Sequence, residues 1–333
     1  MRKTAYIMLI VLCCVLVSCG GGGSDGTGGS VPVVPDPEPD DDQPQEATLF
    51  VDISADTSLP EFVDSQEATC AAGKSVRYQL KFYKFNDNGS VSSAVSYSAV
   101  KIMDYNGSLG ASLTQKLAYG KYKMVVFADF IDAGSESDCY YDTSNPLALR
   151  LTSRFVANDD YCRAYVAVQD VEMSPGVSAN RASALLRMPL ARIRMIANDV
   201  SVYAESIEKC VGEIPFSKYT VKISCGTFPQ VINTATQSVG SYGSKEFSSV
   251  MTDVTSESAM LGYFYIPVSS NKTETKFEVK VYDEDGNLVN TVKQVPVLYM
   301  TGHQTTVSGK FLKKQNEGFG VDPDFDGEIN LEF

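Results

Sequence analysis

The sequence contains no tryptophan, and His303 is its single histidine. A Ser-His-Asp triad uses a histidine as general base, so His303 would have to serve in any such site, and a solitary surface histidine is typically incidental. Zinc sites combine several cysteine and histidine ligands at short spacing, and no C-x-x-C pair occurs here. The sequence therefore predicts a protein that is not an enzyme and that uses no cofactor.

Basic residues are also scarce, because 28 lysines and arginines face 41 aspartates and glutamates, for a formal net charge of −13. No cluster of basic residues interrupts this acidic excess. Such a surface repels phosphate backbones and anionic lipid headgroups. We therefore expect no nucleic-acid partner, and charge cannot be what holds the chain at a membrane.

The first 18 residues have the pattern of a lipoprotein signal peptide. Arg2 and Lys3 precede an apolar run, residues 6–17, that is too short to cross a membrane as a finished helix. The run ends in the lipobox sequence Leu16-Val17-Ser18-Cys19. We expect cleavage before Cys19 and acylation of Cys19, with palmitate among its chains, which anchors the mature protein in a membrane. The alternative is an ordinary signal peptide with an incidental cysteine.

Residues 19–45 cannot bury a core, because they are rich first in glycine and then in proline and aspartate. Glycine-rich chains behave as flexible coils, whereas proline-rich and like-charged chains are extended. We interpret this stretch as a tether that separates the folded part from the membrane.

From residue 46 onward, apolar and polar residues alternate with the period of two that is typical of half-buried strands. The clearest runs are residues 76–82, 122–130, 219–225 and 277–281. Only a turn or two of helix is expected, which Asn198 or Asp199 would cap and which would run toward Lys209. The sequence shows no long amphipathic helices that could connect parallel strands. The chain is therefore predicted to be all-β, with its sheets stacked as sandwiches.

The chain that follows the signal exceeds the usual size of one domain. We therefore predict two tandem β-sandwich domains, an N-terminal one at residues 46–185 and a C-terminal one at residues 186–333. They follow the signal peptide at residues 1–18 and the tether at residues 19–45.

Five cysteines lie beyond the lipobox, so at least one thiol stays free or pairs with another molecule. They are Cys70, Cys139, Cys162, Cys210 and Cys225. An exported protein meets an oxidising compartment, and proximity in sequence favours the pairs Cys139 with Cys162 and Cys210 with Cys225.

The C-terminal residues carry two further patterns. Asp322, Asp324 and Asp326 precede a glycine as in a calcium loop, but the twelfth position is Phe333 instead of glutamate, so a turn is favoured over a calcium site. Ile329, Leu331 and Phe333 then alternate with polar residues as in a final strand. This strand either completes its own sheet or pairs with the sheet of another subunit.

Four segments together resemble the fimbrillin-like superfamily, in particular the anchor and accessory subunits of type V pili. They are residues 120–132, 187–193, 305–312 and 321–330. The resemblance implies two transthyretin-like β-sandwiches in an outer-membrane lipoprotein of a Gram-negative cell. It also implies that, in polymerising members, a trypsin-like protease removes the first strand and a neighbour's C-terminal strand fills the groove.

No lysine or arginine occurs between Lys3 and Lys74. A protease specific for basic residues therefore cannot separate the lipid from the first strand, which we expect at about residues 48–54. This pattern favours an anchor, which keeps both its lipid and its first strand.

The leading hypothesis is a non-enzymatic fimbrial subunit at the outer membrane or in the fimbrium. It would be an anchor or accessory subunit whose partners are other pilus subunits, joined by strand complementation. The alternative is a surface lipoprotein that serves in cell adhesion by binding a glycan or a host ligand, for which tight sugar binding by the monomer would be the discriminating observation.

Overall fold

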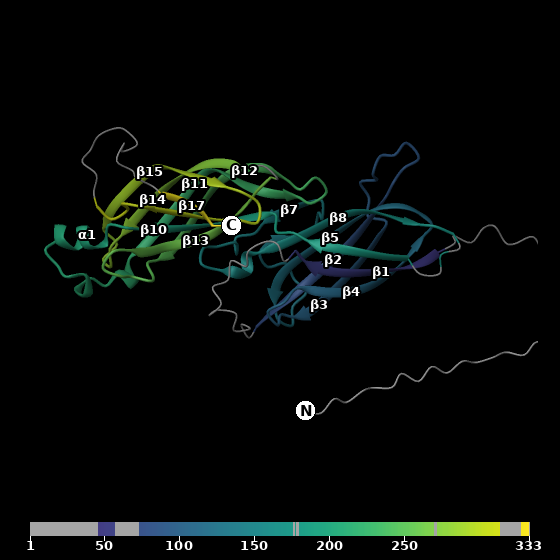
Figure 1. The fold of residues 1–333 in the computed structure, drawn as a ribbon, viewed down its shortest axis with the longest axis horizontal. Coiled ribbons are helices and arrows are strands. Elements are labelled where there is room, and N and C mark those ends of the chain that lie inside the picture. The colour runs from purple at the N-terminus through teal and green to yellow at the C-terminus, as the bar shows by residue number, and fades with distance from the viewer. Residues whose placement is uncertain are drawn as a thin grey trace, which may run out of the picture. The chain divides into compact units, whose positions relative to one another are not determined.

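The computed structural model describes residues 46–56, 73–175, 177, 180–269 and 272–313, together with the strand at 328–332. The predicted signal peptide, the lipid site at Cys19, the tether, Cys70, the aspartates Asp322, Asp324 and Asp326, and Phe333 all lie outside these residues. In the described part, strands predominate in four sheets, which confirms the predicted all-β class (Figure 1). No helix in this part is long and apolar enough to cross a membrane.

The first half of the chain forms two sheets that face each other. One has the strand order β4-β1-β9, with β1 (Glu46–Ala55), β4 (Gly110–Ala118) and β9 (Asn180–Leu186). The other has the order β3-β2-β5-β8, with β2 (Lys74–Lys84), β3 (Tyr97–Asp104), β5 (Gly120–Asp132) and β8 (Ala164–Met173). The Tyr78 hydroxyl on β2 accepts the N–H of Gly110 on β4 at 2.9 Å, which joins the two layers.

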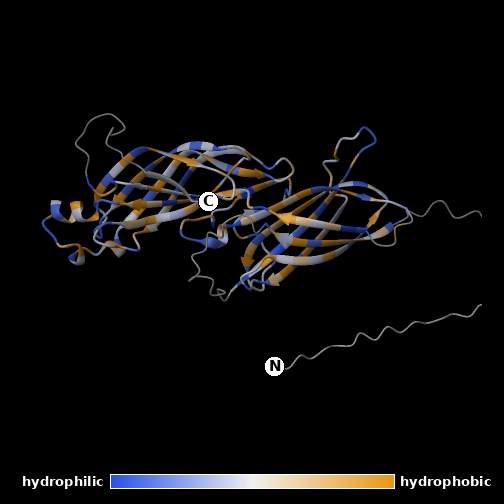
Figure 2. Cartoon of the chain, in the orientation of Figure 1, coloured by the Kyte–Doolittle hydropathy of each residue, from blue (hydrophilic) through white to orange (hydrophobic). Residues whose placement is uncertain are grey.

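The alternation seen in the sequence explains these strands. On β2, the side chains of Val76, Tyr78, Leu80 and Phe82 are buried in the core between the sheets. Figure 2 shows the same alternation of apolar and polar residues along many strands. Because successive side chains of a strand point to opposite faces, this pattern buries one face of each sheet and fixes the register.

The second half contains two larger sheets. One has the order β13-β10-β16-β17, with β10 (Leu190–Ala197), β13 (Ala259–Pro267), β16 (Gln304–Gly309) and β17 (Glu328–Glu332). The other has the order β15-β14-β11-β7-β6, and β12 also pairs with β11. Its strands are β6 (Tyr141–Asp142), β7 (Ala148–Leu151), β11 (Thr220–Asn233), β12 (Ser238–Val250), β14 (Thr273–Tyr282) and β15 (Leu288–Tyr299).

Aromatic rings join these two sheets across the second core. The ring of Phe247 on β12 stacks on that of Phe264 on β13, with 4.4 Å between the ring centroids. The centroid of Phe264 lies 5.2 Å from that of Phe277 on β14. Short helical segments connect the strands. They are α1 (Val200–Ser206), η1 (Asp160–Cys162), η2 (Val211–Glu213) and η3 (Phe216–Lys218).

Strand β9 belongs to the first pair of sheets and β10 to the second, so the chain passes between them at residues 187–189. The sequence places its domain boundary at residue 185, and that division stays a proposal. One segment also crosses between the halves, because β6 and β7 precede β8 in sequence but join the sheet of β11. Residues Pro44–Phe333 form one compact unit.

Residues 133–163, which contain β6 and β7, cover the outer face of the β2–β5 pair. The Arg77 guanidinium donates to the Glu136 carbonyl at 3.1 Å, and the Gln79 amide donates to the Thr143 hydroxyl at 3.0 Å. This cover explains why polar side chains on the outer face of β2, which a sandwich normally exposes to water, are buried.

A buried ion pair lies under this cover. The Arg77 guanidinium donates two hydrogen bonds to the Asp129 carboxylate, at 3.0 and 2.7 Å, and its third nitrogen lies 2.9 Å from Asp138. Burial raises the pKa of Asp129 to about 6, against the opposing effect of Arg77. Burial lowers the pKa of Arg77, but its bonds to Asp129 and Asp138 outweigh burial and the pKa is raised overall. Both partners are therefore charged at neutral pH.

Asn158 pairs with the edge of β13 where the covering segment meets the second half. Its backbone N–H donates to the Tyr263 carbonyl, and its side-chain oxygen accepts the Tyr263 N–H, both at 2.8 Å. The neighbouring Gly262 has a φ of +142°, and the Ser249 hydroxyl donates to the Leu261 carbonyl beside it. An edge strand that is covered in this way offers fewer free backbone groups to other chains.

Substituting Gly262 with alanine is expected to lower the free energy of unfolding by about 1–3 kcal/mol. A Cβ atom at this position would lie 2.7 Å from the Ser249 hydroxyl oxygen and 3.3 Å from the Asn158 side-chain oxygen, at a φ that favours glycine. The measurement is the denaturant midpoint. Gly240→Ala is the matched control, since nothing lies within 4 Å of a Cβ there. Equal midpoints for the two variants would contradict the prediction.

Candidate functional site

Strand β1 lies in the middle of its three-stranded sheet. It pairs antiparallel with β4 over Glu46–Ser54 and parallel with β9 over Leu49–Ala55. Its inward side chains, Leu49, Val51 and Ile53, are buried in the core. The sequence expectation of a strand at about residues 48–54 is therefore confirmed.

Removal of β1 would leave a groove between β4 and β9 with two unpaired strand edges and three missing core side chains. A groove of this kind can accept an extended segment of another chain through main-chain hydrogen bonds. In this sequence the nearest basic residue after β1 is Lys74, the first residue of β2. Cleavage at Lys74 would fall on the far side of β1 and would leave β1 joined to everything that precedes it.

The second candidate element is β17, which pairs antiparallel with β16 and occupies the edge of its sheet. Thr305 lies opposite Leu331 and Val307 lies opposite Ile329 in this register. On its other side, β16 pairs in parallel with β10. Of the two alternatives that the sequence left open, the structure contains pairing within the chain's own sheet, and donation to another subunit stays a prediction.

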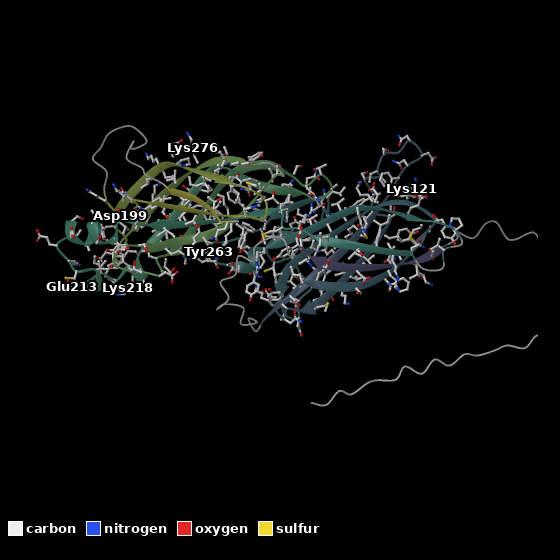
Figure 3. The ribbon with its side chains drawn as sticks, in the orientation of Figure 1. Lys121, Asp199, Glu213, Lys218, Tyr263 and Lys276 are labelled. Atoms are coloured by element: carbon white, nitrogen blue, oxygen red, sulfur yellow. The ribbon has the colours of Figure 1, made fainter. Side chains whose placement is uncertain are left out.

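Asp199 binds the segment that follows β16. Its carboxylate accepts the backbone N–H groups of Phe311, Leu312 and Lys313 at 2.8–3.2 Å. The sequence predicted Asp199 as one of two candidate caps of a short helix, and α1 does begin at the next residue, Val200. Figure 3 labels Asp199 on the ribbon. The expected capping bond is absent, however, because the side chain of Asp199 makes no capping hydrogen bond and is used by residues 311–313.

His303 lies in the turn between β15 and β16. Its ring nitrogen Nδ1 lies 2.7 Å from the Thr301 carbonyl, and its own carbonyl accepts the N–H of Arg192 at 3.0 Å. These contacts bind the turn to β10. Within the described residues, no group of three histidine, cysteine, aspartate or glutamate side chains is placed to hold a metal ion.

Neither of the two predicted disulfides is formed. All four cysteines of the predicted pairs lie within the described residues, and each is a free thiol. Cys210 is exposed at the start of η2, whereas Cys225 is buried in β11, with its sulfur 3.6 Å from the Thr275 hydroxyl. Cys139 and Cys162 are both buried, and the Cys162 thiol donates to the Val156 carbonyl at 3.6 Å. Burial raises the pKa of both of these thiols, which keeps them protonated at neutral pH.

A small polar cleft separates β8 from β9, which the sequence gave no signal for. Val166 of β8 forms an isolated antiparallel bridge with Arg187, the residue that follows β9, and a cleft of about 230 Å³ lies beside this bridge. Gln169, Ser183 and Gln237 contribute the amide and hydroxyl groups of its lining. The lining also includes Arg187, which pairs with Asp56 at 3.2 Å, so the cleft offers amide, hydroxyl and guanidinium groups to a polar ligand.

Comparison with solved structures finds fimbrial proteins. The fimbrial anchor protein Mfa2 from Porphyromonas gingivalis is 12% identical with a TM-score of 0.46, over 86% of this chain and 95% of that chain. The tip fimbrial protein Mfa3 from Porphyromonas gingivalis is 10% identical with a TM-score of 0.41, over 86% of this chain and 99% of that chain. These fimbrial proteins are among the solved structures that the chain is similar to.

No curated protein matches the sequence. One family model does match, over residues 42–333, which is most of the chain and includes both pairs of sheets. The chain therefore belongs to the family of unknown function DUF6562.

Proposed function

We propose that this protein is a non-enzymatic fimbrial subunit, an anchor or accessory subunit, that a lipid on Cys19 holds at the outer membrane. It assembles by pairing its C-terminal strand with the sheet of a neighbouring subunit. The observation that carries this proposal is the position of β17, a five-residue strand at a sheet edge with one hydrogen-bonded neighbour, β16. A strand held on one side can be exchanged for an equivalent strand at little cost in core packing.

The position of β1 supports the anchor role over a shaft role. This strand has neighbours on both sides and three buried side chains, so it fills its own groove. The absence of lysine and arginine between Lys3 and Lys74 keeps β1 continuous with the lipid site under any protease specific for basic residues. A subunit whose groove stays filled can donate a strand without accepting one, and this polarity suits the fixed end of a fibre.

Deletion of Ile329–Phe333 is expected to reduce at least tenfold the amount of fimbrial subunits that copurify with an epitope-tagged chain from its native cells. The deletion removes the apolar positions of the C-terminal strand, so no donor remains. The measurement is quantitative mass spectrometry of the copurified proteins, normalised to the tagged chain.

The matched control for this deletion is the double variant Glu328→Gln and Glu332→Gln. It keeps the length of the strand and its apolar residues, so it should copurify the same subunits as the wild type. Unchanged copurification after the deletion would show that the C-terminal strand does not join this chain to its neighbours.

A further inference from the structure

The Asp199 carboxylate is buried and accepts hydrogen bonds from backbone N–H groups. The residue is 1% exposed, and its two oxygens accept four hydrogen bonds from three consecutive N–H groups, those of Phe311, Leu312 and Lys313. Hydrogen bonds to an ionised acceptor are roughly twice as strong as neutral ones, and burial excludes competing water. This contact therefore holds three residues of the chain in a fixed place.

Asn290 on β15 binds the same three residues from the carbonyl side. Its side-chain amide donates to the carbonyl oxygen of Phe311 at 3.2 Å and to that of Lys313 at 2.7 Å. Its own side-chain oxygen accepts the N–H of Thr291 at 2.8 Å, which orients the amide. Together with Asp199, Asn290 satisfies both the donor and the acceptor of Phe311 and of Lys313.

The side chains of the bound segment are also buried. Phe311 and Leu312 are both inaccessible to solvent and belong to the hydrophobic core. Just before them, the N–H of Asn198 donates to the carbonyl of Gly309, the last residue of β16, at 2.9 Å. We call Asp199 and Asn290, with the residues 311–313 that they bind, the C-terminal clamp.

The bound residues of the C-terminal clamp, 311–313, lie in sequence between β16, which has a neighbour on each side, and β17, which lies at the edge of the sheet. Strand β17 pairs over five residues with one neighbour, whereas the clamp adds six side-chain hydrogen bonds and two buried apolar side chains to three residues. Opening β17 therefore costs less free energy than opening the clamp, because pairing with one neighbour at a sheet edge is weaker than a buried set of hydrogen bonds with two core side chains.

We propose that Asp199 and Asn290 are positioning residues for strand exchange, which form a fixed hinge at Lys313. When β17 leaves β16, opening stops at the clamp, so the second pair of sheets keeps its core and the departing strand keeps a defined origin. This hinge rests on the proposed function in one respect, since both require that β17 can be exchanged. The partner it serves is an extended strand edge of another subunit, which takes the place of β16.

Hydrogen exchange on the full mature chain tests the hinge, with a competing peptide of the sequence of residues 326–333 as the probe. In the wild type, excess peptide is expected to increase amide exchange in β17 at least tenfold and to leave exchange at Phe311–Lys313 unchanged. In Asp199→Asn, which loses the charge while keeping the size, the peptide is expected to increase exchange at both places. Asn290→Ala should behave in the same way.

Asp283→Asn is the matched control, because Asp283 also accepts backbone N–H groups, those of Asp285 and Asn287, but in an exposed turn between β14 and β15. It should behave as the wild type. Substitution of a residue that only stabilises the fold would raise amide exchange throughout its sheet, with or without the peptide. Substitution of a hinge residue instead changes where the opening that the peptide induces stops.

Two results would overturn the hinge. One is wild-type exchange at Phe311–Lys313 that rises together with exchange in β17, and the other is exchange in β17 that the peptide does not change. The proposed function fails separately, if the subunits still copurify after deletion of Ile329–Phe333. Clamp-limited opening together with unchanged copurification would therefore retain the hinge and reject donation to a neighbour.

Discussion

Asp129→Ala is expected to lower the free energy of unfolding by about 3–5 kcal/mol, the usual cost of breaking a buried ion pair by removing one partner. Asp129 has no exposed surface, and Arg77 is nearly as buried. The substitution removes the two hydrogen bonds that the Arg77 guanidinium donates to Asp129. Under the cover of residues 133–163, that cation then keeps its contacts with the Asp138 carboxylate and the Glu136 carbonyl. Denaturant unfolding of the chain measures the loss.

Replacing both charges tests the cause of this loss. The double variant Arg77→Met and Asp129→Leu removes both buried charges and leaves only the partly exposed Asp138 without its cation. It should therefore recover most of the stability that Asp129→Ala loses. Asp170→Ala serves as the surface control, because Asp170 pairs with Lys123 at 2.8 Å but is largely exposed, and its loss should cost about 1 kcal/mol or less. A double variant as unstable as Asp129→Ala would show that packing, and not the unpaired charge, sets the cost.

Trypsin is expected to release less than a tenth of the wild-type protein from isolated outer membranes. The same digestion should release the Thr27→Arg variant almost completely. The wild-type chain has no lysine or arginine between Cys19 and Lys74, so trypsin has no site before β1. Thr27→Arg places one such site in the glycine-rich part of the tether. The measurement is the fraction of protein in the supernatant after mild digestion, detected with an antibody against the folded part.

Thr27→Gln is the control for this experiment, since it changes the same position without adding a trypsin site, and it should stay in the membrane fraction. Recovery of the undigested wild type in the supernatant would contradict acylation of Cys19. Release of the digested wild type with β1 left behind would contradict the retention of this strand in its groove, where it pairs with both β4 and β9.

Alternation in the sequence was enough to predict the main strands. The run from Val76 to Phe82 became β2 and the run from Tyr122 to Phe130 became β5, because in both the apolar residues recur at every second position. The C-terminal run became β17, although its partner could not be predicted. A period of two reveals which face of a strand is buried, but it carries no information on which strand lies next to it.

The cover over the first half was not predicted, for a related reason. Strands β6 and β7 have two and four residues, which is too short for a periodic signal, and they join β11 some eighty positions later in the sequence. Asp129 likewise interrupts an apolar run without indicating that Arg77 binds it from β2. These features depend on contacts between distant segments, which a single sequence does not encode in its local pattern.

The clamp was missed because its residues have better-known local roles. An aspartate before a short helix indicates a cap, and Asp199 does precede α1. Its carboxylate instead binds residues 311–313, which lie more than 110 positions later in the sequence. Asn290 lies inside β15 and gives no signal of its own. The one feature that could have pointed to the site is the apolar pair Phe311-Leu312, because two adjacent large apolar side chains indicate burial.

The parallel pairing of β1 with β9 also sets the order in which the chain can fold. Leu49 pairs with Asn180, so the sheet around the first strand stays incomplete until 131 further residues have followed. A chain that emerges from its amino end exposes the apolar side chains of β1 long before β9 is available to cover them, and late pairing of this kind is slow and prone to aggregation. We therefore expect export of this protein to depend on a holding chaperone until residue 186 has emerged.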